Sequence, residues 1–367
     1  MQKNSKGTVT NVISNSARNG LIPQKDYFDK DIANVENTAG YYIISKNDFV
    51  YNPRKSTDAP YGPISRYTYD KDGIVSPLYL CFHGNNDVNP EYFERFFKSS
   101  VWHRYIYMSG DSGARHDRVS IKDETFFEMP IHLPSDEEQK KIAAFLSLIE
   151  KKIEYQFALV ENLKKYKRGL HDRIFSHLSD SKCEKADLRS IATFCGGGTP
   201  SKDVPSHWNG NIGWISSSDV HEEWVDTISV TRRINDIAIS NSATKLCPSG
   251  TIAIVSRVGV GKVALMSEDL CTSQDFTNIT SIKGNTLFMT YQIAYKMKIE
   301  AAKTQGTSIK GITAEEIKSL KIDMPADEEQ RYIATLLSSL DIRLRQEIRK
   351  ADCLHTLKNA LLQQLFI

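Results

Sequence analysis

The sequence lacks long hydrophobic segments, paired cysteines and a strong charge of one sign. No apolar run is long enough to cross a bilayer, and the first 20 residues are polar, unlike a signal peptide, so we expect a cytoplasmic protein without membrane contact. The six cysteines are scattered without a CxxC pair, which argues against a disulfide framework and a zinc cluster. The formal net charge is only +2, so any nucleic-acid binding must come from local arrangements of charge.

Catalytic signatures are also missing. Residues 259–262 resemble the end of a phosphate-binding loop, but Ser256 replaces its first glycine and Val263 replaces the Ser/Thr that would hold magnesium. His221 does not begin a zinc-protease motif, because Val225 stands where the second histidine is required. No set of residues forms a recognisable active site, so we expect a chain that is not an enzyme.

One stretch of the sequence occurs twice. Shifting the chain by 191 positions places residues 133–176 over residues 324–367 without a gap, and nine of the fourteen positions from Pro134 to Ser147 are identical. The motif LPSDEEQKKIAAFL recurs as MPADEEQRYIATLL. Self-similarity on this scale reports architecture, so the chain is predicted to consist of two copies of one unit.

Both copies have the pattern of a long helix. Ser135 and Glu138 predict a capping box in the first copy, and Asp327 with Gln330 is expected to cap the second. Apolar residues then recur at steps of three and four, which is typical of a coiled-coil seam. The seam comprises Ile142, Leu146, Ile149, Ile153, Val160, Leu163 and Leu170, and in the twin Ile333, Leu337, Leu340, Leu344, Ala351, Leu354, Leu361 and Leu365. One copy alone would also fit an amphipathic helix on a globular core, but two copies in register favour a helix pair of about 60 Å.

A globular region precedes each long helix. Short β-branched and aromatic runs between turn residues predict strands, followed by an apolar helix, a glycine-led loop and a short acidic turn. In the first region the helix starting at Asn89 carries an aromatic stripe that we expect to be core. We therefore predict an α+β fold of two mixed α/β domains and two long helices. The expected boundaries are 1–133, 134–178, 179–324 and 325–367.

The two copies differ in length. With a period of 191 and a total of 367 residues, the first copy has 176 residues, fifteen fewer than the second. A strand at residues 188–194 is expected to open the second globular region. Its counterpart is expected to be missing from the first.

Polar residues in predicted loops are candidates for DNA contacts, because Arg and Lys can bind phosphates or guanine while Ser and His can read other base edges. The candidates are Arg54, Lys55, Ser56, Arg115, His116, Arg118, Thr199, Ser201, Lys202, Arg257, Lys262, Lys303 and Lys310. Each of them, taken singly, also fits an ordinary solvated surface residue.

Taken together, the motifs resemble the specificity (S) subunit family of type I restriction-modification systems over essentially the whole chain. The two DEEQ helix starts resemble that family's spacer helices. The second region carries GGGTPSKD, IGWISSSDV, GTIAIVSRVGVGKVAL and TSQDFTNIT, and the first carries YYIISKNDFVYNPRKS, GIVSPLYLCF and GARHDRVSIKDETFFEMPI. GGTP alone would be weak, but the combination is specific.

The resemblance implies two target recognition domains, each reading half of a split, asymmetric double-stranded DNA sequence, and an antiparallel helix pair as a coiled-coil spacer. It implies two methyltransferase subunits and restriction subunits as partners. S-adenosylmethionine, ATP and magnesium are then expected on those partners, with no cofactor or metal bound by this chain. Antiparallel helices also relate the two domains by an approximate two-fold axis, a symmetry that a DNA duplex shares.

Two other functions remain open from the sequence. One is an enzyme in its own right, a nuclease or methyltransferase, against which the missing motifs weigh. The other is a coiled-coil adaptor of a methyltransferase complex without its own sequence specificity, which the nearly neutral domains permit.

Overall fold

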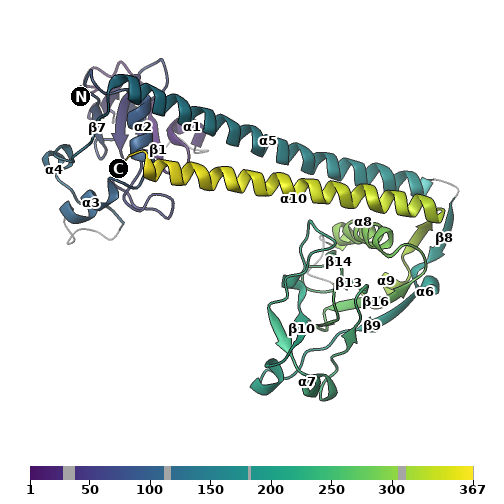
Figure 1. The fold of residues 1–367 in the computed structure, drawn as a ribbon. Coiled ribbons are helices and arrows are strands. Elements are labelled where there is room, and N and C mark those ends of the chain that lie inside the picture. The colour runs from purple at the N-terminus through teal and green to yellow at the C-terminus, as the bar shows by residue number, and fades with distance from the viewer. Residues whose placement is uncertain (28–37, 111–116, 181–182, 305–310, 367) are drawn as a thin grey trace. The chain divides into compact units, whose positions relative to one another are not determined.

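The computed structural model describes residues 1–27, 38–110, 117–180, 183–304 and 311–366. The chain divides into two compact units (Figure 1). Unit 1 comprises Met1–Phe157 and Arg349–Ile367, and unit 2 comprises Ala158–Ile348. Two long helices, α5 (Asp136–Asp180) and α10 (Asp327–Gln364), each contribute one part to each unit.

Unit 1 is built from small antiparallel sheets and short helices. Strands β1 and β2 form a hairpin, β3 pairs with β6, and a three-stranded sheet has the order β5-β4-β7. The elements are β1 (Ile13–Ser16), β2 (Gly20–Pro23), α1 (Gln24–Tyr27), β3 (Tyr42–Ile44), β4 (Asp48–Tyr51), β5 (Ile64–Arg66), β6 (Gly73–Val75), β7 (Leu80–His83), α2 (Pro90–Lys98), α3 (His103–Ser109) and α4 (Asp123–Phe127).

Aromatic packing forms the core of unit 1. The predicted aromatic stripe is buried, as expected, but the single helix predicted there is two: α2 ends at Lys98, α3 begins at His103, and Trp102 is the residue before α3. Phe93 packs edge-on against Phe49 of β4, with ring centroids 5.1 Å apart. Leu146 of α5 and Leu362 of α10 belong to the same core, so the long helices are an integral part of the unit.

Unit 2 contains two four-stranded sheets, ordered β14-β13-β16-β9 and β11-β10-β15-β12, and the pair β17-β8. Its core joins β13 and β16 to α8 and to buried residues of both long helices, including Phe175 and Leu337. The elements are β8 (Glu184–Asp187), α6 (Leu188–Ile191), β9 (Ala192–Gly196), η2 (Pro205–Trp208), β10 (Ile212–Ile215), η3 (Ser217–Asp219), β11 (Arg232–Ile234), α7 (Asp236–Ser240), β12 (Leu246–Cys247), β13 (Ile252–Val255), β14 (Val263–Leu265), β15 (Leu270–Thr272), β16 (Phe276–Ile282), α8 (Thr286–Thr304), α9 (Ala314–Lys318) and β17 (Lys321–Met324).

One sheet in each unit has a corresponding strand order. In unit 1 the central strand β4 lies between β5 and β7, and in unit 2 the central strand β13 lies between β14 and β16. Among the described residues, this sheet has one more strand in unit 2, β9, which pairs antiparallel with the outer side of β16. The sequence prediction of a strand over residues 188–194 is wrong in its first half, where the chain forms the single helical turn α6.

The long helices pair antiparallel and bury the predicted seam. Leu146, Ile153 and Val160 of α5 and Leu337 and Leu344 of α10 are all buried. The start of α5 shares a core with the end of α10 in unit 1, and the end of α5 shares a core with the start of α10 in unit 2. The antiparallel helix pair and the mixed α/β domains confirm the predicted fold class.

Two ion pairs display the internal symmetry. Glu150 of α5 pairs with Lys358 of α10 at 3.0 Å in unit 1, and Lys167 of α5 pairs with Asp341 of α10 at 2.6 Å in unit 2. The two acids lie one 191-residue period apart, and so do the two lysines. In unit 1 the acid is on α5 and the lysine on α10, and in unit 2 the lysine is on α5 and the acid on α10. This exchange is what a pseudo-two-fold repeat requires.

The repeated DEEQ motif fixes each helix start to its own domain. The capping box of Ser135 and Glu138 is confirmed, with hydrogen bonds of 3.2 and 3.4 Å between backbone N–H and side-chain oxygen atoms. The expectation that Gln330 caps α10 is wrong. Its side chain is buried, accepts from the backbone N–H of Asn285 at 2.9 Å and donates to the carbonyl of Pro325 at 2.8 Å.

Gln139 makes the same contacts in unit 1. It accepts from the backbone N–H of Asn89 at 2.8 Å and donates to the carbonyl of Pro134 at 3.0 Å. Asn89 in turn caps α2, so one amide side chain joins the domain helix to the start of the long helix. Across the described residues, no helix is long and apolar enough to cross a membrane.

Candidate nucleic-acid interface

In unit 1 three of the candidate residues, Arg54, Lys55 and Arg118, meet where β4 ends. The loop that follows this strand pairs with residues 117–119: Lys55 donates its backbone N–H to the carbonyl of Asp117 at 2.9 Å, and Val119 donates to the carbonyl of Pro53 at 2.8 Å. Arg54 and Arg118 form a bridge within this pairing. The structure thereby brings Arg54, Lys55 and Arg118 together from segments more than sixty residues apart.

Local contacts hold this loop in place. Asn52 donates its side-chain amide to the carbonyl of Asn15 at 3.2 Å and accepts from the backbone N–H of Arg54 at 3.1 Å. Gly62 packs so closely that a Cβ atom there would lie 2.2 Å from the carbonyl oxygen of Asn52, and its φ of +83° also favours glycine. Arg54 and Lys55 themselves are exposed, so a rigid loop presents two cations to solvent.

In unit 2 the equivalent loop follows β13. Ile312 donates its backbone N–H to the carbonyl of Ser256 at 2.8 Å, and a Cβ atom at Gly311 would lie 2.7 Å from that carbonyl oxygen. Arg257, which is exposed, follows Ser256 directly. Because β4 and β13 are the central strands of corresponding sheets, the arginine-bearing loops occupy the same place in the two repeats.

A groove lies beside the loop in each unit. In unit 2 a groove of about 640 Å³ is lined by Arg257, Gln274, Thr313 and Lys318. Thr199 donates a hydrogen bond from its hydroxyl to the side-chain carbonyl of Gln274, so Thr199 contacts a residue that lines this groove. The structure thus brings together Arg257 and Thr199 among the predicted residues of unit 2.

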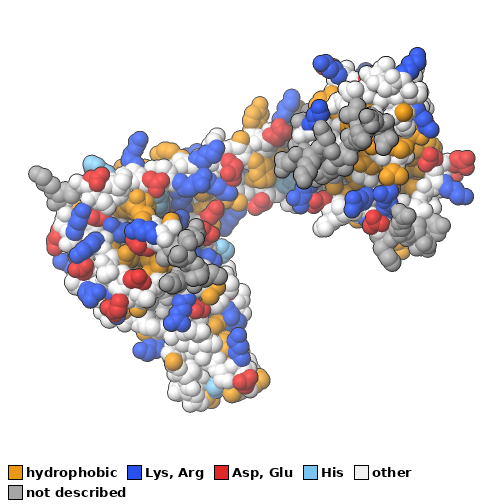
Figure 2. Space-filling model, turned by 180° about the vertical axis from the view of Figure 1, so that it is seen from behind, with side chains coloured by type: hydrophobic (Ala, Val, Ile, Leu, Met, Phe, Trp, Pro, Cys, Tyr) orange, Lys and Arg blue, Asp and Glu red, His pale blue; other side chains and the backbone are white. Residues whose placement is uncertain are grey.

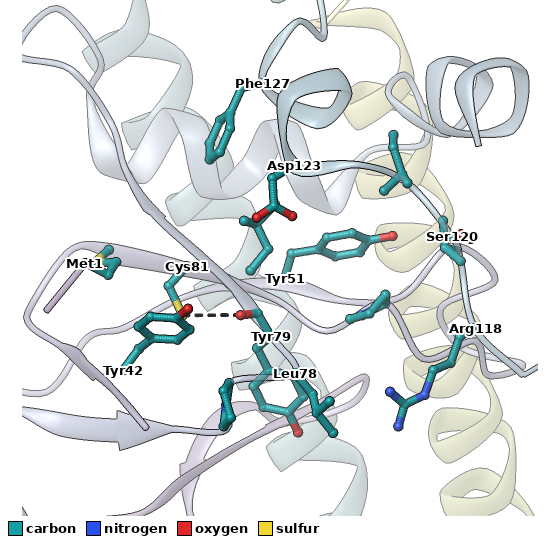
Figure 3. A pocket seen from close by; sticks show the side chains of 15 residues that line it. Met1, Tyr42, Tyr51, Leu78, Tyr79, Cys81, Arg118, Ser120, Asp123 and Phe127 are labelled. Atoms are coloured by element: carbon teal, nitrogen blue, oxygen red, sulfur yellow. Dashed lines mark hydrogen bonds between the residues drawn. The ribbon is translucent and has the colours of Figure 1, made fainter. Parts of the chain in front are cut away.

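The groove of unit 1 has a volume of about 690 Å³ (Figure 3). Met1, Tyr42 and Cys81 lie at one end of the view and Arg118 at the other. Four residues that line this groove, from the loop and from α4, lie one period before residues that line the groove of unit 2. They are Ser120, Ile121, Asp123 and Phe127, corresponding to Gly311, Ile312, Ala314 and Lys318. The two grooves are therefore repeat-related.

Other predicted residues lie apart from the grooves. Ser56 forms a turn with Ala59, which donates its backbone N–H to the Ser56 hydroxyl at 3.1 Å. Lys262 donates to the carbonyl of Ser217 at 3.3 Å, and Lys303 forms an ion pair with Glu300 at 2.7 Å.

Two further candidates, Ser201 and Lys202, are exposed on the loop after β9. The indole N–H of Trp208 holds this loop by donating to the carbonyl of Ser201 at 3.1 Å. Arg115, His116 and Lys310 lie outside the described residues.

Sequence reasoning missed Gln274 and Arg232 as polar groups of unit 2. Gln274 lies within the motif TSQDFTNIT, which could have marked it. Arg232 gave no such signal: its guanidinium lies 4.5 Å from the ring centroid of Trp214 and 2.6 Å from the carboxylate of Asp219, contacts that only the fold creates. Burial alone would raise the pKa of Asp219, but hydrogen bonds from Ser216, Arg232 and Thr231 lower it, so this carboxylate stays charged.

The surface charge is finely mixed. Figure 2 shows Lys and Arg side chains interspersed with Asp and Glu over the visible face of each unit. This agrees with the net charge of +2. Among the described residues no single basic face is visible in this view, and the exposed candidate cations, such as Arg54 and Arg257, are carried by individual loops.

Comparison with known proteins gives one family. The model of the type I restriction modification DNA specificity domain matches residues 2–165 and 180–351. The chain is 29% identical over 187 residues to the type I restriction enzyme MjaIX specificity subunit of Methanocaldococcus jannaschii, covering 49% of this chain and 43% of that protein. It is 30% identical over 241 residues to the EcoR124I/EcoR124II specificity subunit of Escherichia coli, covering 62% and 58%. The chain thus spans about half the length of these curated relatives.

Solved structures share the fold at low sequence identity. The HsdS subunit from Thermoanaerobacter tengcongensis superimposes with a TM-score of 0.59 and 16% identity, covering 100% of this chain and 92% of that one. A chain from a study of complex assembly and conformational transition of the type I R-M system gives a TM-score of 0.60 and 17% identity, covering 87% and 81%.

Proposed function

Because the chain belongs to the type I restriction modification DNA specificity family, we propose that it is the DNA sequence-recognition subunit of a type I restriction-modification complex. It reads a bipartite, asymmetric target in double-stranded DNA, one half with each domain, and it is not itself catalytic. The observation that carries the proposal is the occurrence of the same arginine-bearing loop and groove in both repeats. The grooves of the two units carry mostly different side chains at repeat-related positions, which suits the reading of two DNA half-sites that differ in sequence.

The proposed chemistry of reading follows from the two loops. Arg54 and Arg118 in unit 1 and Arg257 in unit 2 can donate two hydrogen bonds to the major-groove edge of guanine or to a phosphate. Gln274, held by Thr199, offers the bidentate amide that suits adenine. The backbone pairing that fixes each loop lowers the conformational entropy lost on binding.

The helix pair is the proposed platform for methyltransferase subunits. Besides the buried seam, α5 carries large exposed apolar residues at heptad-like spacing on a second face: Phe145, Leu148, Tyr155, Leu159 and Tyr166. Apolar residues at such spacing suit packing against a helix of another chain. We expect two methyltransferase subunits and, in the full complex, restriction subunits. S-adenosylmethionine, ATP and magnesium would reside on those partners, and the chain would act in the cytoplasm.

Methylation mapping tests the reading function. The chain is co-expressed with its methyltransferase subunits, and modified adenines are located by genome sequencing. We expect one split consensus sequence, with Arg54→Ala changing recognition of one half and Arg257→Ala of the other. Arg104→Ala and Arg189→Ala, exposed positions outside the grooves, serve as matched controls. Methylation without a split consensus would favour an adaptor that lacks sequence specificity. Modification of DNA by the purified chain alone would establish an enzyme instead.

A second experiment tests whether the helices set the gap between half-sites. Seven residues are inserted into α5 after Phe157 and seven into α10 after Ile348, so that the seam pattern continues. One heptad lengthens a helix by about 10 Å, the rise of about three base pairs. The mapped gap is expected to grow by about this amount. An unchanged gap with full activity would refute the spacer role.

A further inference from the structure

The loop that follows β9 in unit 2 lies very close to the turn between β15 and β16. A Cβ atom at Gly197 would lie 2.0 Å from the carbonyl oxygen of Ser273, and one at Gly198 would lie 2.4 Å from the carbonyl carbon of Ala243. Gly198 also donates its backbone N–H to the carbonyl of Thr272 at 2.8 Å. A side chain at either glycine would collide with backbone, so the glycines of the motif GGGTP allow the loop and the turn to meet.

Further hydrogen bonds fix both pieces of backbone. Trp214, which is buried, donates its indole N–H to the carbonyl of Gly198 at 2.9 Å. In the turn, the carbonyl of Asp275 accepts from the backbone N–H of Ser256 at 2.8 Å and from its hydroxyl at 2.9 Å. The loop and the turn are therefore held in place by groups of the domain itself.

Thr199 and Gln274 meet where the loop contacts the turn. The hydroxyl of Thr199 donates to the side-chain oxygen Oε1 of Gln274. Gln274 is exposed and lines the groove, and its side-chain nitrogen Nε2 has no hydrogen-bond partner in the described part of the chain. Since a carbonyl oxygen has two lone pairs, the amide keeps Nε2 as a donor and the second lone pair of Oε1 as an acceptor for a ligand.

The orientation of such an amide decides which base it fits. In the major groove adenine presents the acceptor N7 beside the N6 amino donor, whereas guanine presents two acceptors, N7 and O6. An amide with a fixed orientation can donate from Nε2 to N7 and accept at Oε1 from the amino group of adenine. Against guanine the same amide would set Oε1 opposite O6, acceptor against acceptor. An amide that is free to turn over can donate to O6 instead, so the exclusion of guanine requires a fixed amide.

We propose that Thr199 is a positioning residue whose hydroxyl makes Gln274 selective for adenine over guanine. This role rests on the proposed reading function and deepens it, because it adds the group that sets the selectivity of one base contact. Gln274 contacts the base, and Thr199 acts only through Gln274. The motif GGGTP then serves sequence specificity, since its glycines bring Thr199 to the turn that carries Gln274.

The test uses the complex of the full chain with its methyltransferase subunits. Methylation mapping gives the consensus, and competition gel shifts then compare duplexes with adenine or guanine at each position. Gln274→Ala identifies the position that Gln274 reads. At that position Thr199→Val, which keeps the shape but lacks the hydroxyl, should lower the preference for adenine over guanine about tenfold, and Thr199→Ser should keep it within about twofold. Adding Thr199→Val to Gln274→Ala should cause no further loss, because the two residues act as one unit.

Thr280→Val is the matched control. Thr280 lies on β16, and its hydroxyl donates to the carbonyl of Thr193 at 3.4 Å, outside the groove, so this variant should keep the full preference. An unchanged preference in Thr199→Val, an equal loss at every position, or a loss that Thr199→Ser does not restore would overturn the proposal. A split consensus that Gln274→Ala leaves intact would also overturn it while sparing the reading function. Absence of any split consensus would overturn both.

Discussion

The ion pair between Lys167 and Asp341 offers a sharp test of how the helix pair is held in register. Asp341 is buried, and its carboxylate also accepts a hydrogen bond of 2.8 Å from the hydroxyl of Tyr291 on α8. Lys167 donates in addition to the carbonyl of Glu223 at 2.8 Å and lies 4.7 Å from the ring centroid of Trp224. We consider Asp341→Leu, Lys167→Met and the double variant.

The expected change in the free energy of unfolding depends on which polar groups each substitution leaves without a partner. Removing one partner of a buried ion pair costs about 3–5 kcal/mol. For Asp341→Leu we expect the lower end, about 3 kcal/mol, because Lys167 keeps the Glu223 carbonyl and is partly exposed. The hydroxyl of Tyr291, left without its acceptor, adds about 1 kcal/mol. The double variant leaves no unpaired charge and should lose only about 1–2 kcal/mol, so the pair should show a coupling energy above about 2 kcal/mol.

Lys167→Met makes a separate prediction about pH. Burial raises the pKa of Asp341, opposed by Lys167 and by the hydrogen bond from Tyr291. Without the lysine the pKa must rise further, and an acid whose pKa is higher in the folded state stabilises the fold increasingly as the pH falls. Relative to the unaltered chain, the variant should therefore regain stability when the pH is lowered from neutrality toward 5.

Urea unfolding followed by tryptophan fluorescence measures these effects. Three of the four tryptophans, Trp208, Trp214 and Trp224, lie in unit 2, so the signal reports mainly the unit that is changed. A coupling energy below about 0.5 kcal/mol would refute the reasoning, because it would mean that the pair is solvated in the folded chain.

The equivalent site in unit 1 supplies an internal control. There Glu150 pairs with Lys358 and also with Arg95, which occupies the place of Tyr291 and is buried. Glu150→Leu leaves this guanidinium without a carboxylate, although it still donates to the carbonyl of Glu91 at 3.0 Å, so we expect a loss of about 4 kcal/mol that Lys358→Met does not rescue. Equal rescue in the two units would show that the charge of Arg95 is unimportant.

Three further outcomes are expected. Gln330→Leu should lower the free energy of unfolding, measured in urea, by about 2 kcal/mol, because the N–H of Asn285 and the buried carbonyl of Pro325 lose their hydrogen-bond partner. An unchanged free energy would contradict the proposed link between helix start and domain. Burial lowers the pKa of His171 to about 4, so the chain should lose up to about 3 kcal/mol as the pH falls from about 6.5 to 4. His171→Phe should flatten this slope, and an unchanged slope would exclude His171 as the cause. Arg257→Ala should reduce the salt dependence of DNA binding by about one unit of slope in gel shifts; wild-type binding would remove Arg257 from the interface.

Much of the architecture could be predicted because its signals are local or repeated. The seam residues are spaced for one helix face, and the second copy identifies that face as a helix-helix contact. Errors arose where a distant partner decides the local structure. Gln330 looks like a capping residue from its place in the sequence. Its side-chain oxygen instead accepts from the backbone N–H of Asn285, 45 residues earlier. Residues 188–191 look like a strand, yet contact with Leu320 holds them as a helical turn.

The candidate site was predictable only in part, for the same reason. Arg54 and Arg257 could be proposed because each follows a clear strand. Their joining to Arg118 and to Gln274 depends on pairing between segments far apart in the chain, which composition and spacing do not report. Arg232 shows the limit most clearly, since its contacts with Trp214 and Asp219 are created by the folded sheet.

The two glutamines suggest how such a chain can keep one scaffold while its domains differ. The hydrogen bonds of the Gln139 and Gln330 side chains go to backbone groups: each accepts from one N–H, Gln139 donates to the carbonyls of Asp87 and Pro134, and Gln330 donates to that of Pro325. A backbone contact does not depend on the side chains of the domain, so loops around Arg54 and Arg257 can change without disturbing it. Backbone atoms therefore attach each domain to its long helix, whereas side-chain atoms are the candidates for recognition. This separation agrees with the two repeats, in which nine of fourteen positions at the helix starts are identical while three of the four corresponding groove residues differ.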